Sequence, residues 1–344
     1  MQRLERFPPA YFALVMATGI VAVGAHLEEW DTVSHALAGV NLAAFAVLWA
    51  LTIVRLVRFP RAVVADVSDF LRAPGFFTSV AGTAIVGTQA IVIHGRPQAA
   101  QVLWLVALSL WLLVTYGVFS RLVVARAKPT LAEGIDGGWL TAVVATQSIS
   151  VLGTLVAPSF DAWRGVVLFV SLSAWLCGGM LYIWLIALIF YRWVFFAFEP
   201  SDLTPTYWIN MGAMAISSLA GSLLVMHASL ESYLTGLLPF LQGFTLFFWA
   251  TATWWIPLLL VLGFWRHVTR RVPVVYDPLY WGAVFPLGMY TVCTYRLAQV
   301  LGLAFLFAVS HVFAYIALTA WGLAFAGLLR RMWRIPRPEA TARR

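Results

Sequence analysis

Charged residues are scarce in this sequence. Of its 344 residues, 10% are charged and 62% are hydrophobic, whereas soluble globular proteins have about 25% charged and about 45–50% apolar residues. A water-soluble fold with so few charges would expose large apolar patches, and a disordered chain would contain far fewer apolar residues. The composition therefore excludes a soluble enzyme and a disordered segment.

Cysteines and mid-segment charges are also lacking. The two cysteines, Cys177 and Cys293, lie in apolar runs and provide neither a disulfide framework nor a metal-ligand spacing. No Asp, Glu, Lys or Arg lies near the middle of a long apolar run. Since such residues mark proton relays and cation pathways in membranes, we expect neither a carboxylate-coupled pump nor a cation pore. No HExxH, GxSxG or paired-carboxylate motif is present, so we expect no enzyme, no cofactor and no metal site.

Long apolar runs fill most of the chain. A membrane-spanning helix needs about 20 mostly apolar residues, and ten runs reach this length. They lie near residues 8–26, 35–57, 75–94, 100–123, 138–157, 164–191, 207–228, 237–263, 279–297 and 303–329. Because the connections are short, we expect an all-α integral membrane protein with one transmembrane domain over residues 1–344.

The distribution of Lys and Arg predicts the orientation. With the N-terminus in the cytoplasm, all but three of the 22 Lys and Arg residues fall on the cytoplasmic side, the exceptions being Arg96, Arg164 and Arg296. The positive-inside rule therefore places both termini in the cytoplasm, and it accounts for the net charge of +8 without nucleic acid as a partner. We expect a multi-pass protein of the plasma or inner membrane, with the lipid bilayer as its surroundings.

Five of the runs begin alike, with a Pro or Gly followed by aromatic residues. The starting residues are Pro9, Pro74, Gly138, Pro205 and Pro278, on the order of 66 residues apart, which indicates a repeated unit. Pro at a helix start with interfacial aromatics is ordinary for any single membrane helix, but five starts in register predict five helical hairpins in a pseudo-fivefold arrangement. Residues 1–25 also resemble a signal peptide; the repeat favours them as the first copy of the unit.

Small and polar residues are concentrated on several odd-numbered runs, whereas the eighth run is rich in Phe and Trp. They indicate either close packing with hydroxyls bonded between helices or the lining of a polar path. The set as a whole favours odd helices inside, around a pore, and even helices outside. Aligning the starts gives a first ring and a second, hydroxyl-bearing one. The first contains Met16, Ala81, Val144, Gly212 and Phe285, and the second includes Thr18, Thr83 and Thr146.

An uncharged lining with a basic inner mouth suits small anions, with selectivity set by dehydration cost and pore width. Two groups near the expected outer side stand apart. Arg296 attracts an anion or snorkels to the headgroups. His311 carries a proton with the substrate or is satisfied by a neighbouring backbone group or hydroxyl. His26, His94 and His227 all fall at outer helix ends, which leaves a membrane haem or redox protein as an alternative of a different class.

Three segments carry a resemblance to a known family. They read FPPAYFALVMATGIVAVG (Phe7–Gly24), LTPTYWINMGAMAISSLAG (Leu203–Gly221) and YDPLYWGAVFPLGMYTVCT (Tyr276–Thr294). The chain resembles, over its whole length, the tellurite-resistance/dicarboxylate transporter family. That family includes tellurite-resistance channel homologues, malic-acid permeases, sulfite exporters and slow anion channels.

The resemblance implies a homotrimer in which each subunit encloses its own pore. A phenylalanine before a proline on the ninth helix occludes the pore in that family, and the matching residues are Phe285 and Pro286, after Trp281. The expected function is the transport of small anions, with C4-dicarboxylates such as malate as the favoured cargo. Alternatives are a channel or exporter for sulfite, nitrate or chloride, and a proton-coupled dicarboxylate carrier that uses His311.

Overall fold

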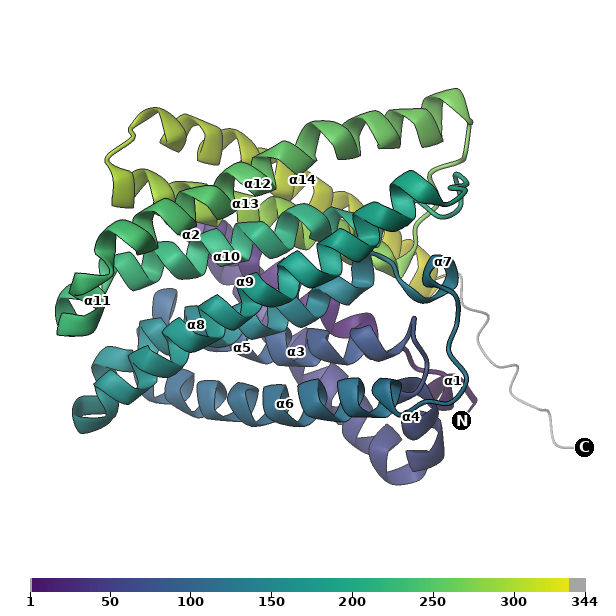
Figure 1. Ribbon diagram of the computed structural model, residues 1–344, viewed down its shortest axis with the longest axis horizontal. Helices are drawn as coiled ribbons and strands as arrows, with labels where there is room; N and C mark the ends of the chain where they lie inside the picture. The colour runs from purple at the N-terminus through teal and green to yellow at the C-terminus, as the bar shows by residue number, and fades with distance from the viewer. Residues whose placement is uncertain (1, 334–344) are drawn as a thin grey trace, which may run out of the picture.

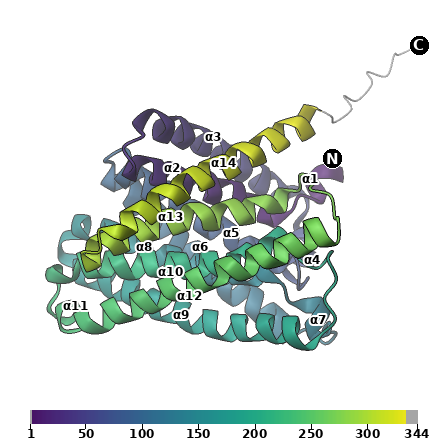
Figure 2. The ribbon, with the colours of Figure 1, turned by 90° about the horizontal axis from the view of Figure 1, so that it is seen from above.

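The computed structural model describes residues 2–333, and every regular element in that range is a helix. Ten long helices form a bundle (Figures 1 and 2). They are α2 (Ala13–Leu27), α3 (Asp31–Arg58), α5 (Phe77–Val92), α6 (Pro97–Val123), α8 (Thr141–Val156), α9 (Arg164–Phe195), α10 (Ile209–Met226), α12 (Leu238–Phe264), α13 (Trp281–Leu301) and α14 (Phe305–Trp333). The short helices are α1 (Gln2–Glu5), α4 (Pro60–Val67), α7 (Leu131–Gly134) and α11 (Ser232–Gly236).

Eight helical segments of residues 2–333 are long and apolar enough to cross a membrane. One of them, Gly137–Phe195, is 59 residues long and contains both α8 and α9, and α13 is not among the eight. The expectation of an all-α membrane protein is therefore confirmed, while the ten-span topology stays a prediction. Four of the residues expected in the cytoplasm, Arg334, Arg337, Arg343 and Arg344, lie outside the described residues.

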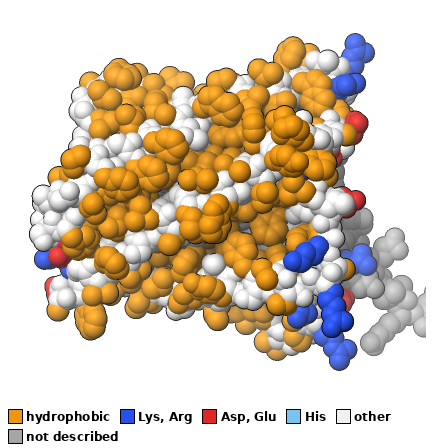
Figure 3. Space-filling view, viewed as in Figure 1, with side chains coloured by type: hydrophobic (Ala, Val, Ile, Leu, Met, Phe, Trp, Pro, Cys, Tyr) orange, Lys and Arg blue, Asp and Glu red, His pale blue; other side chains and the backbone are white. Residues whose placement is uncertain are grey.

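The surface is apolar between its two ends. Hydrophobic side chains cover most of the face in Figure 3, and Lys and Arg side chains gather at one end of the molecule, near the last turns of α12 and α6. An apolar band bounded by charge matches the hydrocarbon core of a bilayer and its headgroups. We call the end with most Lys and Arg the basic end.

The long helices fall into a buried and an exposed set. Helices α2, α5, α8, α10 and α13 bury most of their residues, whereas α3, α6, α9, α12 and α14 bury a narrow stripe each. Among the buried helices α2 contacts α5, α5 contacts α8, α8 contacts α10, α10 contacts α13, and α13 contacts α2. Each exposed helix packs on the buried helix before it in the chain. The small residues of the buried helices therefore serve close helix packing.

Each buried helix is entered through a short 3₁₀ turn. The turns are Pro9–Phe12, Ala73–Phe76, Gly137–Leu140, Pro205–Trp208 and Pro278–Tyr280, at the five positions where the sequence pattern recurs. Four of them begin with proline at the first or second position, where its fixed φ and missing N–H cost nothing. The Thr78 hydroxyl donates to the Pro9 carbonyl at 3.2 Å, and Thr141 donates to the Pro74 carbonyl at 2.7 Å, so successive units are joined by the same bond.

Tryptophans of the exposed helices bind hydroxyls of the buried ones. The indole Nε1 of Trp111 donates to the Thr146 hydroxyl at 2.8 Å, and Trp321 donates to Thr18 at 3.0 Å. A Trp on α12 makes the equivalent bond, since Trp249 donates to a Thr hydroxyl of α13 at 2.9 Å. An N–H group in hydrocarbon needs an internal acceptor. Part of the polar content of the buried helices therefore faces outward, toward the exposed set.

A buried ionic cluster fixes the α3–α4 connection at the basic end. Asp66 accepts from Arg55 Nη2 at 2.6 Å and from Arg72 Nε at 2.6 Å. Arg55 also donates to the Glu5 carbonyl, from Nε at 3.1 Å and from Nη2 at 2.9 Å. The side chains of Arg55 and Asp66 are 4% and 9% exposed. Each charge is therefore stabilised by its partners in the cluster and not by water.

We expect Asp66→Asn to lower the free energy of unfolding by about 3–5 kcal/mol, because it leaves the Arg55 charge buried without a carboxylate. Unfolding in detergent, followed by heat or denaturant, measures this change. The matched control is Glu231→Gln, which breaks the more exposed Arg164–Glu231 pair at 3.3 Å and should cost less than about 1 kcal/mol. Equal effects of the two changes would contradict a stabilising role for the buried cluster.

Candidate functional site

The wider of two cavities lies where the buried helices begin. It has a volume of about 330 Å³ and lies among the 3₁₀ turns, at the basic end. Its lining includes Pro8, Pro9, Pro74 and Pro278, for which we call it the proline cavity. The hydroxyl-bearing residues Thr78, Thr141 and Thr206 line it, as do Arg72 and Asp136.

Asp136 is the acidic residue of this lining. It is half-buried and accepts from the Gly138 N–H at 2.9 Å and from the Thr206 hydroxyl at 3.2 Å. Burial raises the pKa of the Asp136 carboxyl above its usual value, and the two hydrogen bonds oppose this shift. The carboxyl therefore becomes neutral at a higher pH than an exposed aspartate does.

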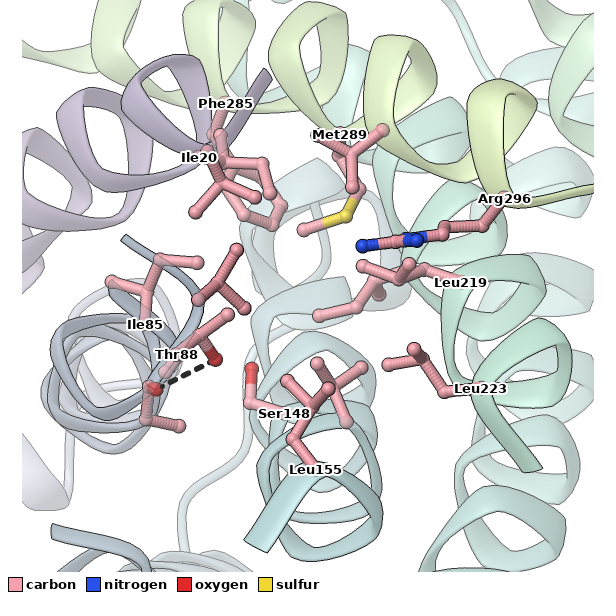
Figure 4. Close-up of a pocket in the computed structure, with 17 residues that line it drawn as sticks. Ile20, Ile85, Thr88, Ser148, Leu155, Leu219, Leu223, Phe285, Met289 and Arg296 are labelled. Atoms are coloured by element: carbon pink, nitrogen blue, oxygen red, sulfur yellow. Dashed lines mark hydrogen bonds between the residues drawn. The ribbon is translucent and has the colours of Figure 1, made fainter. Parts of the chain in front are cut away.

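The second cavity lies further along the same five buried helices. It is narrow, with a volume of about 30 Å³, about the share of one water molecule in the liquid. We call it the Arg296 cavity, because Arg296 is the only charged residue of its lining. Figure 4 shows Phe285, Met289 and Arg296 following one another along α13, with the Arg296 guanidinium extended inward between Met289 and Leu219. Its polar lining side chains are Thr88 and Ser148, and aliphatic side chains make up most of the rest.

Phe285 lies between the two cavities along α13. Leu279 and Gly282, before it, line the proline cavity, and Phe285 itself is the first α13 residue that lines the Arg296 cavity. Its side chain is 3% exposed. The other four buried helices show the same order, because each contributes residues to the proline cavity first and to the Arg296 cavity later, about two turns on for α2, α8 and α10 and about one turn on for α5.

The remaining members of the first ring lie at this intermediate level. Ala81 lines the Arg296 cavity beside Phe285. Met16 and Val144 are 2% and 0% exposed and line neither cavity. On each of their helices, residues before them line the proline cavity and residues after them line the Arg296 cavity. Gly212 packs against Pro286, since a Cβ added there would lie 2.7 Å from the proline Cγ, and the two residues hold α10 close to α13.

The threonines of the second ring lie elsewhere. Thr18 and Thr146 accept from the indoles of exposed helices, as described above, and line neither cavity. The Thr83 hydroxyl donates to the Ser79 carbonyl at 2.8 Å and is fully buried. The physical reason is the rotation of each helix: two residues after the ring position, a helix presents a face about 200° away.

Arg296 is half-buried, and its Nη1 donates to the Gln299 side chain at 2.9 Å. Its guanidinium carbon lies 6.0 Å from the ring centroid of Tyr295. No carboxylate among residues 2–333 lies within 4 Å of it. The Arg296 guanidinium therefore adds a positive charge without a carboxylate partner to a lining that is otherwise uncharged.

His311 lies outside both cavities, on α14. Its Nδ1 is 2.6 Å from a carboxylate oxygen of Glu28, at the end of α2, and Glu28 also accepts from Ser310 at 3.2 Å. The rings of Trp30 and Tyr315 flank it, with centroids 6.0 and 5.0 Å away. A carboxylate, rather than a backbone group or a hydroxyl, is thus the partner of His311, and the side chain joins α14 to α2.

The three histidines considered for haem have separate surroundings. His26 Nδ1 lies 3.6 Å from Asp31, His94 packs on His35 with ring centroids 5.7 Å apart, and His227 Nδ1 lies 2.9 Å from the Leu223 carbonyl. None of these contacts joins two of the three histidines.

The sequence interpretation missed most residues of the Arg296 cavity, but one signal was available. Phe285, Met289, Val292 and Arg296 all line the cavity, and their spacing of four, three and four residues is that of one helix face. Extending the face that carries Phe285 would have predicted this set. Asp136 has no comparable signal, since its place in the proline cavity depends on the contact between two successive 3₁₀ turns.

An all-helical membrane protein with two cavities in line along the same helices is typical of a channel or a transporter. The chain belongs to the voltage-dependent anion channel family (SLAC1), whose sequence pattern matches residues 6–329. The resemblance seen in the sequence is thereby confirmed. An uncharacterized transporter of Methanocaldococcus jannaschii is 23% identical over 306 residues, 87% of each chain. An uncharacterized membrane protein of Mycobacterium tuberculosis H37Rv is 36% identical over 154 residues, 44% of this chain and 77% of the relative.

Proposed function

We propose that this protein conducts small anions passively along a path from the proline cavity to the Arg296 cavity, and that Phe285 closes this path. The observation that carries the proposal is the position of Phe285, a bulky side chain that lines the Arg296 cavity at its end nearest the proline cavity. The Arg296 cavity is small, with a volume of about 30 Å³. We expect an anion to pass the level of Phe285 only when the Phe285 ring moves.

The proposed architecture is five hairpins in a pseudo-fivefold arrangement. The chain of contacts from α2 through α5, α8, α10 and α13 back to α2 supports it. Ten spans, with both termini on the cytoplasmic side of the plasma or inner membrane, fit the basic end and the apolar surface. A homotrimer with one path per subunit is proposed from the resemblance.

The proposed cargo is a small anion, with C4-dicarboxylates such as malate as the first candidates and sulfite, nitrate and chloride as alternatives. Arg296 and the absence of other charges from its cavity support an anion. Anion flux into proteoliposomes tests the proposal, with each of the four anions offered separately, with and without a pH gradient. Flux without a pH gradient would support a passive path, and no flux of any of the four anions, in either the wild type or Phe285→Ala, would contradict it.

The proton-coupled alternative depends on His311. Because His311 lines neither cavity and bonds to Glu28, we expect His311→Ala to leave the pH dependence of anion uptake unchanged. Uptake driven by an imposed pH gradient, compared between wild type and variant, measures this. Loss of acid-stimulated uptake in the variant would replace the passive path with a coupled carrier. For the haem alternative, the spectrum of the purified protein decides, and we expect no Soret band.

A further inference from the structure

A third cavity lies at the basic end, outside the proposed path. It has a volume of about 70 Å³, between the last turn of α12, the turn Pro205–Trp208 and the start of α13. Arg266 and His267 line it, and so do the aromatic residues Trp208 and Tyr280. We call it the Arg266 cleft. Basic groups opposite Trp and Tyr are the composition found where membrane helices meet the headgroup layer.

The Arg266 guanidinium is only partly satisfied. Its Nη1 donates to the Leu203 carbonyl, and its Nε is buried without a hydrogen-bond partner. No carboxylate among residues 2–333 lies within 4 Å of it. Two acids that lie near lining residues of the cleft in the sequence are engaged elsewhere, since Asp202 pairs with Arg192 at 3.8 Å and Asp277 accepts from the Leu279 N–H at 2.8 Å. A buried donor without a partner is costly, and an anionic oxygen would satisfy it.

The backbone around Arg266 holds the basic groups at the rim of the cleft. Residues Trp265–Thr269 form a π-helical turn, a form frequent at functional sites. His267 Nδ1 lies 2.8 Å from the Val272 carbonyl, which fixes the imidazole ring. Arg270 and Arg271, which follow, are exposed, and they extend the positive charge that Figure 3 shows at this end of the molecule.

The cleft continues into an apolar surface that faces lipid. Gly263 lines it, and a Cβ added there would have no atom within 4 Å. Beside it on α12, Leu260, Val261 and Phe264 are 57%, 64% and 61% exposed. A ligand with a charged head in the cleft therefore has an apolar surface for its tail one helical turn away.

We propose that the Arg266 cleft binds the phosphate of an anionic phospholipid from the leaflet at the basic end. The phosphate accepts from Arg266 and lies near His267, the aromatic residues pack around the glycerol, and the acyl chains follow the exposed face of α12. The same phosphate chemistry exists in free inorganic phosphate, but only a lipid uses the apolar surface beside Gly263. Because Ala283 also lines the cleft, the bound lipid lies two residues from Phe285 along α13.

Native mass spectrometry of the detergent-purified protein tests the site, with phosphatidylglycerol and phosphatidylcholine as probes. We expect one phosphatidylglycerol to bind the wild type more tightly than phosphatidylcholine does, and Arg266→Gln to weaken it about fivefold, as for loss of one basic residue at a membrane surface. Gly263→Leu, which keeps every charge and fills the cleft, should weaken it as well. The matched control is Arg61→Gln, an exposed arginine outside the cleft, which should bind like the wild type.

Two outcomes would overturn the proposal. Equal phosphatidylglycerol binding by the wild type, Arg266→Gln and Gly263→Leu would show that the lipid binds elsewhere. Displacement of the lipid by millimolar inorganic phosphate would show a site for free phosphate. Neither result depends on anion flux, so the lipid site and the proposed conduction are tested separately.

Discussion

Replacing Phe285 by Ala is expected to raise anion flux at least about tenfold, since each ~1.4 kcal/mol removed from a barrier raises a rate about tenfold. The ring is 3% exposed and lines the Arg296 cavity at its end nearest the proline cavity. We expect its removal to widen the passage between the two cavities and to lower both the steric and the dewetting barrier. Proteoliposome flux of chloride, nitrate, sulfite and malate measures the effect and ranks the anions.

A purely structural role of Phe285 predicts the opposite result. The truncation would then lower the free energy of unfolding by about 3–5 kcal/mol with no gain of flux. Phe77→Ala is the matched control, because Phe77 is a fully buried residue of α5 that lines neither cavity. It should destabilise the protein and leave flux at the wild-type level. Increased flux in both variants would indicate a general leak.

Replacing Arg296 by Gln is expected to lower anion flux about tenfold when measured in the Phe285→Ala background, where the gate no longer limits the rate. A tenfold change corresponds to about 1.4 kcal/mol, a modest value for one charge at the edge of an apolar cavity, where screening is incomplete. Arg296 is the only charged residue of that lining. The loss should be greatest at low ionic strength and shrink as salt is added.

Arg96→Gln is the control for this prediction. Arg96 is exposed, lines neither cavity and is expected on the same side of the membrane as Arg296. It should leave flux and its salt dependence unchanged. Equal losses in the two variants would mean that Arg296 acts through surface charge alone, and an unchanged flux in Arg296→Gln would mean that the side chain snorkels to the headgroups.

The sequence predicted the features that local signals encode. Proline at the start of a helix has a direct backbone cause, so Pro9, Pro74, Pro205 and Pro278 were found as starts, and a 3₁₀ turn lies at each of them. Phe285 was named from its sequence context with Pro286. The structure places it between the two cavities, and its gating role stays a proposal.

Which face of a helix points inward was less predictable. Thr146 was expected to line the pore, but its hydroxyl both donates to the Ala142 carbonyl and accepts from Trp111 of a neighbouring helix. A threonine that donates a hydrogen bond to a carbonyl of its own helix is tolerated on either face of that helix. Composition alone therefore does not predict which way it points. The buried Arg55–Asp66 pair and the Glu28–His311 contact are likewise set by tertiary packing between helices, one of them across most of the chain.

Cysteine accessibility shows whether a path runs past Phe285. Ala13→Cys places a thiol in the proline cavity, in a chain whose own Cys177 and Cys293 are replaced by Ser. A membrane-impermeant, negatively charged thiol reagent is then added from the Arg296 side, both to the protein with Phe285 and to the Phe285→Ala variant. As a positive control, the same reagent is added from the basic end, where it should react in both proteins. We expect rapid modification from the Arg296 side only when Phe285 is absent. Equal modification rates in the two backgrounds would contradict it.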